Sequence, residues 1–236
     1  MTDSRPSVSV CVLSYQRPKW LNDTLFSLCD NTNYPFELII NDDGSVDNDS
    51  VLHGWRNSAT IITNPNGWNE GVGRSINKCF KIATGDILIK VDTDLQFVQG
   101  WLETVVDLFD DEEHARLGLL GLCHYYHDPV DMRKTLINEL DDYDVHTHIL
   151  GSCFALKREV YEEFGISSYS ESFAEDWELM KKIEASDKWH NGLPLKQLAS
   201  NYGMGLGNST VALPDGKGGV KSAKIHKETY KINYGN

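Results

Sequence analysis

Two carboxylates one residue apart, in Asp92-Thr93-Asp94, are the side chains of this sequence best suited to chemistry. They directly follow the mostly apolar run 86–91, which predicts a buried strand. Carboxylate oxygens are the ligands that hard divalent cations such as Mg²⁺ and Mn²⁺ prefer. A cation held there would neutralise the charge of a diphosphate leaving group without proton transfer. The triplet therefore predicts a divalent metal site, and its place after a strand makes it more informative than an isolated triplet.

Two further acidic pairs follow or open predicted elements. Asp42 and Asp43 close the apolar run 36–40; they are typical of a turn, or one of them accepts a hydrogen bond from a nucleobase or a ribose. Glu175 and Asp176 open a predicted helix, where acidic residues favour the helix dipole. An aspartate held in a crevice near apolar surface can instead act as a base toward an acceptor hydroxyl. Both interpretations of each pair stay open at this point.

The elements that would position these acids alternate along the first hundred residues. Apolar, β-branched runs predict strands at 8–13, 36–40, 60–63 and 86–91. Helical spacing of apolar residues predicts helices at 18–30, 46–55 and 71–83. Such alternation indicates an α/β fold with a parallel sheet covered on both faces. Ligands bind beyond the carboxyl ends of such strands, so Ser14-Tyr15, Asp42-Asp43 and Asp92-Asp94 are expected to converge on one crevice.

The remainder of the chain is less regular. We expect a helix from 98 to about 109, an apolar stretch at 117–123, a strand at 149–156, and helices at 157–164, ended by Gly165, and at 175–185. The polar segment 124–150 is either a hairpin or a flexible insert, and from Gly192 onward no regular element can be placed. The small residues of Gly151-Ser152-Cys153 would let a substrate approach the backbone closely.

Composition narrows the class of protein. The net charge of −13 opposes non-specific binding to nucleic acid or anionic lipid. The C-terminal stretch is basic instead, with Lys217, Lys221, Lys224, Lys227 and Lys231 around His226. It is either a solvated end or a segment that folds over a phosphate-bearing ligand. Five widely spaced cysteines without a CxxC pair, and no run that resembles a membrane span or a signal peptide, predict a soluble, cytoplasmic protein.

Several motifs occur together and in a recognisable order: "VSVCVLSYQRPKWLNDTLFSL", "FELIINDDGSVD", "NPNGWNEGVGRSIN", "ATGDILIKVDTD", "GSCFALKREVYEEFG" and "FAEDWELMKKI". Together, over about residues 7–185, they resemble the family 2 glycosyltransferases with a GT-A fold. The resemblance implies a Rossmann-like, mostly parallel sheet flanked by helices in a single domain, 1–236. Residues 7–97 would form the nucleotide-sugar half, and 98–236 the acceptor half with its C-terminal extension.

The resemblance also implies roles for single residues. Ser14, Tyr15, Asp42 and Asp43 would line the donor pocket, with Asp43 reading the base. Asp92 and Asp94 would hold Mn²⁺ or Mg²⁺ on the diphosphate of a UDP-sugar. Asp176 would be the catalytic base of an inverting transfer, and Glu175 would orient the acceptor.

This sequence departs from the family pattern in two places. Many relatives have Arg directly before the residue equivalent to Asn77, whereas here Ile76 precedes it and Arg74 lies two residues earlier. Arg74 and Asn77 are therefore candidates for donor contacts without a firm equivalence. Some GT-A enzymes add a late histidine to the metal, which makes His226 a candidate ligand.

Other functions have weaker support. The loop after the first strand lacks the glycine fingerprint of dinucleotide-binding enzymes, and the chain has no P-loop motif. A sugar-1-phosphate nucleotidyltransferase would share the sheet and the metal-bound nucleotide, but would need a glycine-rich basic loop after that strand. A non-catalytic nucleotide-sugar-binding module would not need a base. The acceptor is not indicated: polysaccharide, lipid-linked sugar, protein, small molecule and nucleic-acid base all remain open.

Overall fold

A computed structural model describes residues 5–65, 67–124, 134–167, 175–201, 210–214 and 220–224. Up to residue 110 the elements are β1 (Val8–Ser14), α1 (Pro18–Asp30), β2 (Glu37–Asp42), α2 (Asp49–Trp55), β3 (Thr60–Thr63), α3 (Val72–Ile82), β4 (Ile87–Asp92), β5 (Leu95–Phe97) and α4 (Trp101–Asp110). Beyond it they are η1 (Glu112–His114), β6 (Leu117–Gly121), β7 (Leu136–Glu139), β8 (Tyr143–His146), β9 (Cys153–Lys157), α6 (Arg158–Phe164), α7 (Glu175–Glu184), β10 (His190–Pro194), β11 (Ala199–Asn201), β12 (Thr210–Pro214) and β13 (Val220–Lys224).

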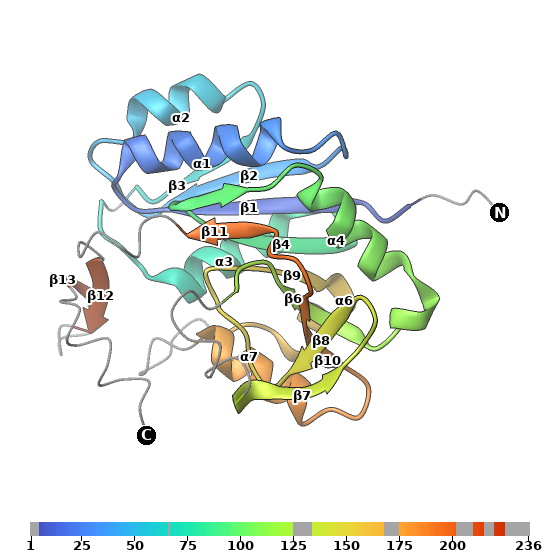
Figure 1. The fold of residues 1–236 in the computed structure, drawn as a ribbon. Helices are drawn as coiled ribbons and strands as arrows, with labels where there is room; N and C mark the ends of the chain where they lie inside the picture. Colours follow the sequence, from blue (N-terminus) through green and yellow to red (C-terminus); the bar gives the residue numbers. More distant parts are fainter. Residues whose placement is uncertain are drawn as a thin grey trace.

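A mixed nine-stranded sheet, in the order β3-β2-β1-β4-β9-β6-β10-β8-β7, forms the centre of the molecule (Figure 1). The strands β3, β2, β1 and β4 are parallel, as the alternation of strands and helices predicts. β9 then pairs antiparallel with both β4 and β6, and β7 and β8 form the antiparallel hairpin that was one of two expectations for this region. The second half of the sheet is mixed, because β6 and β10 are parallel whereas its other neighbouring strands are antiparallel. Antiparallel neighbours need no helical crossover between them.

Helices cover both faces of the sheet, because successive strand residues point to opposite sides. On β1, Val10 and Val12 pack with α1, α2 and α4, whereas Cys11 and Leu13 pack with α3, α6 and α7. Figure 1 shows α1 and α2 on one side of the sheet, with α3 and α7 on the other. The expected α/β fold with two covered faces is confirmed. α6 ends at Gly165, which takes a left-handed φ of 61° as predicted for its stop.

Sequence reasoning placed no regular element after Gly192, and the structure has four strands in or beyond this region. β10 belongs to the central sheet, β11 pairs with β5, and β12 pairs with β13. Sequence reasoning did not find these strands because polar residues, glycine or proline interrupt their apolar residues. The β5–β11 ladder places Asn201 opposite Leu95, the residue directly after Asp94. The chain beyond residue 201 therefore begins next to the predicted metal site.

Candidate active site

The polar ends of three neighbouring strands lie in register. Ser14 at the end of β1 pairs with Asp42 on β2, and Leu13 pairs with Asp92 on β4. The carboxyl ends of these parallel strands therefore meet at one edge of the sheet, as predicted. Tyr15 continues directly from Ser14 and is half-buried.

Asp42 is held by a compact set of hydrogen bonds. Its Oδ2 accepts from the backbone N–H of Ser45 at 3.0 Å, and its Oδ1 accepts from Ser45 Oγ at 2.6 Å and from Asn48 Nδ2 at 2.7 Å. Asn48 Nδ2 also lies 2.7 Å from Ser14 Oγ, which ties the β1 end to the β2 turn. Asp42 therefore makes the contacts of a turn residue. Asn48 joins Ser14, Asp42 and Ser45 in this hydrogen-bond network, and sequence reasoning missed it.

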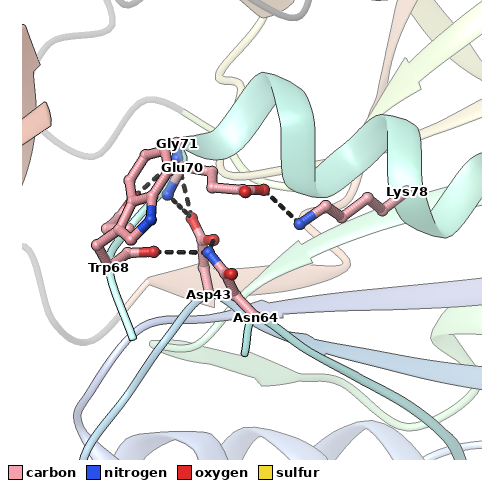
Figure 2. A network of polar contacts seen from close by, with 7 residues as sticks. Asp43, Asn64, Trp68, Glu70, Gly71 and Lys78 are labelled. Carbon is pink, nitrogen blue, oxygen red and sulfur yellow. Dashed lines mark hydrogen bonds and ion pairs between the residues drawn. The ribbon is translucent and has the colours of Figure 1, made fainter. Parts of the chain in front are cut away.

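Asp43 fixes a separate loop, drawn in Figure 2. Its Oδ2 accepts hydrogen bonds from the backbone N–H groups of Glu70 at 2.8 Å and Gly71 at 2.9 Å, and Asn64 Nδ2 lies 3.4 Å from its Oδ1. Asn64 also donates to the Trp68 carbonyl at 2.7 Å. Burial raises the pKa of Asp43, and these hydrogen bonds oppose the rise by favouring the carboxylate. Asp43 is therefore a buried anchor for the loop that leads into α3.

Asp92 and Asp94 are paired with cations instead. Lys90 Nζ lies 2.7 Å from Asp92 Oδ1, and Arg17 Nη1 lies 3.9 Å from Asp94 Oδ2. The Asp92 side chain keeps 35% of its surface exposed, whereas that of Asp94 keeps 13%. Among the described residues no three His, Cys, Asp or Glu side chains gather in a metal-binding group. Within the part of the chain that the structure describes, Asp92 and Asp94 are thus the carboxylates of the predicted site.

The loop that supplies Arg17 is strained. Gln16 and Arg17 both adopt left-handed backbone conformations, with φ of 57° and 63°, which non-glycine residues rarely take. The backbone N–H of Gln16 donates to Ser45 Oγ at 2.6 Å, and the Arg17 guanidinium lies 4.8 Å from the ring centre of Trp20. Such strain persists only where the surroundings fix it, and it is common at functional sites.

Asp176 packs directly against Gly151. A Cβ atom built on Gly151 would lie 1.4 Å from Asp176 Oδ2, so only glycine leaves room for this carboxylate. Burial raises the pKa of Asp176; the nearby Lys90 charge opposes that rise and the Asp92 charge adds to it. The small residue at 151 was expected to admit substrate to the backbone, and in the structure it admits the predicted base.

Lys90 connects the predicted base to Asp92 at the end of β4. Its side chain is 4% exposed, and Nζ donates to the Gly151 carbonyl at 2.8 Å while contacting Asp92. We define the Lys90 group as Lys90, Asp92, Gly151 and Asp176. Sequence reasoning missed Lys90, although one signal was present: it is the only charged residue within the apolar strand 87–91, two residues before Asp92 and so on the same face.

The remaining candidates are distributed differently. Arg74 is exposed on α3. Asn77 is buried; its Nδ2 donates to the carbonyls of Gly73 and Ile166, both at 2.8 Å, so both amide protons bind the protein. Glu175 is the first residue of α7, and His226 lies outside the described residues. No described helix is long and apolar enough to cross a bilayer.

Comparison with known proteins identifies the family of the chain. The model of the family described as Glycosyl transferase family 2 matches residues 9–165. A glucosyl-dolichyl phosphate glucuronosyltransferase of Haloferax volcanii is 30% identical over 110 residues, which cover 46% of this chain and 35% of that protein. An uncharacterised glycosyltransferase of Nostoc sp. is 26% identical over 120 residues, 50% of this chain and 36% of the relative. This chain thus matches about a third of the length of these relatives.

Solved structures share the fold. A mannosyltransferase of Pyrobaculum calidifontis, in complex with GDP-Man and Mn²⁺, superposes with a TM-score of 0.63 at 18% identity, over 81% of this chain and 55% of that one. TarS 1–349 of S. aureus, in complex with UDP, gives a TM-score of 0.63 at 20% identity, over 82% of this chain and 59% of that one. The GT-A-like fold is thereby confirmed.

Proposed function

This chain belongs to glycosyl transferase family 2, and we propose that it moves a sugar from a UDP-sugar to an acceptor hydroxyl, with inversion at the anomeric carbon. The observation that carries the proposal is the Lys90 group. It brings a half-buried carboxylate, Asp176, to the end of β4 through a continuous chain of contacts from Asp92. A base and a diphosphate site side by side are what a one-step transfer needs.

Asp176 performs the proton transfer in this mechanism. Its carboxylate removes the acceptor proton as the acceptor oxygen bonds to the anomeric carbon. The bond from that carbon to the diphosphate breaks on the opposite face, and the nucleoside diphosphate leaves with the bonding electrons. The raised pKa of Asp176 makes it a stronger base than an ordinary aspartate. Glu175, its neighbour at the start of α7, orients the acceptor.

Asp92 and Asp94 fit a divalent cation in their chemistry. Both present hard oxygen donors, and both already attract cationic side chains, Lys90 and Arg17. Bound Mn²⁺ or Mg²⁺ would supply charge neutralisation for the leaving diphosphate. The Mn²⁺ in the Pyrobaculum mannosyltransferase complex supports the same assignment here. His226, which lies outside the described residues, is a further candidate ligand that the family resemblance suggests.

The donor pocket in this proposal lies between the β1 and β2 ends and the loop before α3. Ser14, Tyr15 and Asp42 line it, and Asp43 reads the base. A carboxylate offers about four lone-pair sites, of which Asp43 uses three within the protein. The UDP and UDP-GlcNAc complexes of TarS favour a uracil base, and Arg74 is exposed for contact with the donor.

The proposal also assigns the two halves of the domain. Residues 7–97 bind the nucleotide-sugar, and residues 98–236 bind an acceptor of unknown identity. The halves share one sheet, because β9 of the second pairs with β4 of the first.

The test is a donor screen. Hydrolysis of UDP-, dTDP- and GDP-sugars is measured with Mn²⁺, with EDTA, and on the variant Asp94→Ala. We expect UDP-sugar turnover in Mn²⁺, its loss in EDTA, and donor affinity reduced by about 10–100-fold in the variant. Full activity in EDTA would contradict the metal assignment, and a clear preference for GDP would contradict the base assignment.

A further inference from the structure

Lys90 is an unusual residue for its position. The strand 87–91 is buried, and the Lys90 side chain is 4% exposed. Burying an ammonium group is costly unless charged or polar partners compensate, and lysine is seldom fully buried. An apolar side chain would extend the hydrophobic run without that cost. The contacts of Lys90 should therefore explain why a lysine occupies this position.

One partner of Lys90 belongs to the predicted metal site, and the others belong to the backbone next to the proposed base. On one side Nζ contacts Asp92 Oδ1 at 2.7 Å; on the other it lies 2.8 Å from the Gly151 carbonyl oxygen and 3.4 Å from that of Ser152. Asp176 packs on Gly151, so the ammonium group also fixes the backbone on which the base lies. One buried charge thus contacts a carboxylate of the metal site and the seat of the base.

The charge on Lys90 has a consequence for cation binding. A divalent cation on Asp92 would sit close to an ammonium group that already occupies one of its oxygens. Like charges repel, and the repulsion is stronger at a partly buried site than in bulk water. A donor diphosphate brings negative charge that outweighs this repulsion. Metal alone therefore binds poorly, and metal with donor binds well.

We propose that Lys90 is a positioning residue that holds Asp92 in the absence of donor, makes metal binding depend on the nucleotide diphosphate, and fixes the Gly151 backbone beneath Asp176. This inference rests on the proposed function and deepens it. It assigns to one residue both the order in which the ligands bind and the alignment of the base.

The test uses three substitutions of Lys90, chosen to separate the effect of its charge from that of its hydrogen bond. Lys90→Met removes both, whereas Lys90→Gln keeps a donor for the Gly151 carbonyl. Lys90→Arg retains the charge, and Lys157→Met removes a half-buried lysine at the far end of β9 as the control for net charge. Mn²⁺ binding is measured by electron paramagnetic resonance with and without UDP, and kcat and KM with a UDP-sugar. Circular dichroism checks that each variant is folded.

We expect Lys90→Met and Lys90→Gln to bind Mn²⁺ without UDP about tenfold more tightly than the wild type. Lys157→Met and Lys90→Arg should bind Mn²⁺ like the wild type. kcat should fall about tenfold in Lys90→Met with little change in KM, and less in Lys90→Gln. A purely structural lysine would lose metal affinity and rate together.

Unchanged or weaker Mn²⁺ binding in folded Lys90→Gln overturns the proposal on Lys90, whether or not the wild type transfers sugar. Should Lys90→Met fail to fold, Lys90→Gln and Lys90→Arg still decide it. If the Lys90 variants bind Mn²⁺ more tightly and UDP strengthens Mn²⁺ binding by the wild type, but the wild type turns over no UDP-sugar, the result contradicts the proposed function alone.

Discussion

The acids at the end of β2 and those at the end of β4 look alike in sequence but are held in opposite ways. Asp42 and Asp43 accept hydrogen bonds from backbone N–H groups and amide side chains, which have no charge to exchange. Asp92 and Asp94 contact cationic side chains instead. A carboxylate neutralised by a movable cation can pass to another cation, whereas one held by backbone and amide donors stays where it is. The β2 acids are therefore fixed in place by the fold, with one lone-pair site of Asp43 left for a ligand, and the β4 acids can exchange a side-chain cation for a bound one.

The largest effect should come from the base of the Lys90 group. Asp176→Asn keeps the size of the side chain but cannot accept a proton, so transfer should fall by about 10²–10⁴-fold. UDP affinity in Mn²⁺ should stay within about twofold, because the β4 acids are intact. Both quantities are measured at one metal concentration, with Glu175→Gln expected to act more mildly through acceptor affinity. Near-normal transfer by Asp176→Asn would place the base elsewhere.

A second prediction concerns the seat of that base. Gly151→Ala places a methyl group where Asp176 Oδ2 lies, so the carboxylate must move. A misplacement of about 1 Å can cost about a hundredfold in rate, and we expect a loss of that order in kcat. Gly54→Ala is the matched control, since a Cβ there meets no atom within 4 Å. Equal kcat for the two alanine variants would show that Asp176 does not depend on this contact.

The β2 acids should respond in stability instead of rate. Asp42→Ala removes three hydrogen bonds at a buried site and should lower the free energy of unfolding by about 1–3 kcal/mol. At about 2–4 °C per kcal/mol, thermal unfolding without ligand should show the shift. Asp47→Ala, an exposed acid in the same turn, should leave Tm within about 1 °C. If Asp42→Ala is as stable as Asp47→Ala, the comparison between the two groups fails.

The smallest effect should be on the pH dependence of transfer. Burial raises the pKa of Asp176, against the Lys90 charge and together with the Asp92 charge, and His148 lies within its electrostatic reach. A general base acts only when it is ionised, so kcat/KM should fall as the pH drops through this raised pKa. The fall should therefore begin at a higher pH than it would for an ordinary aspartate, whose pKa is about 3.9. The residual activity of Asp176→Asn should lack this acid limb. An identical limb in that variant would assign it to another group.

The elements that sequence reasoning found are those defined by their own residues. The strands β1 to β4 are apolar runs, and α1 and α3 carry apolar residues at helical spacing. The alignment of Ser14, Asp42 and Asp92 followed from one rule about parallel strands, and the register confirms it.

What sequence reasoning missed depends on residues far apart in the chain. Asn64 is 21 residues from Asp43, and Lys90 is 61 residues from Gly151. No local pattern encodes such contacts, and the short strands β5 and β11 stabilise each other only when paired. The charged residue inside the β4 run was nevertheless visible, because a lone lysine among apolar strand residues contradicts the local pattern.

The β5–β11 ladder has a consequence for how the enzyme is made. Leu95 pairs with Asn201, so the strand that follows Asp94 can form its ladder only after about a hundred further residues have been translated. At roughly 5–20 residues per second, that delay is on the order of 5–20 s. During this interval the nascent chain carries the predicted metal ligands Asp92 and Asp94 beside an unpaired edge. Biosynthesis itself thus postpones this pairing until residue 201 has been translated.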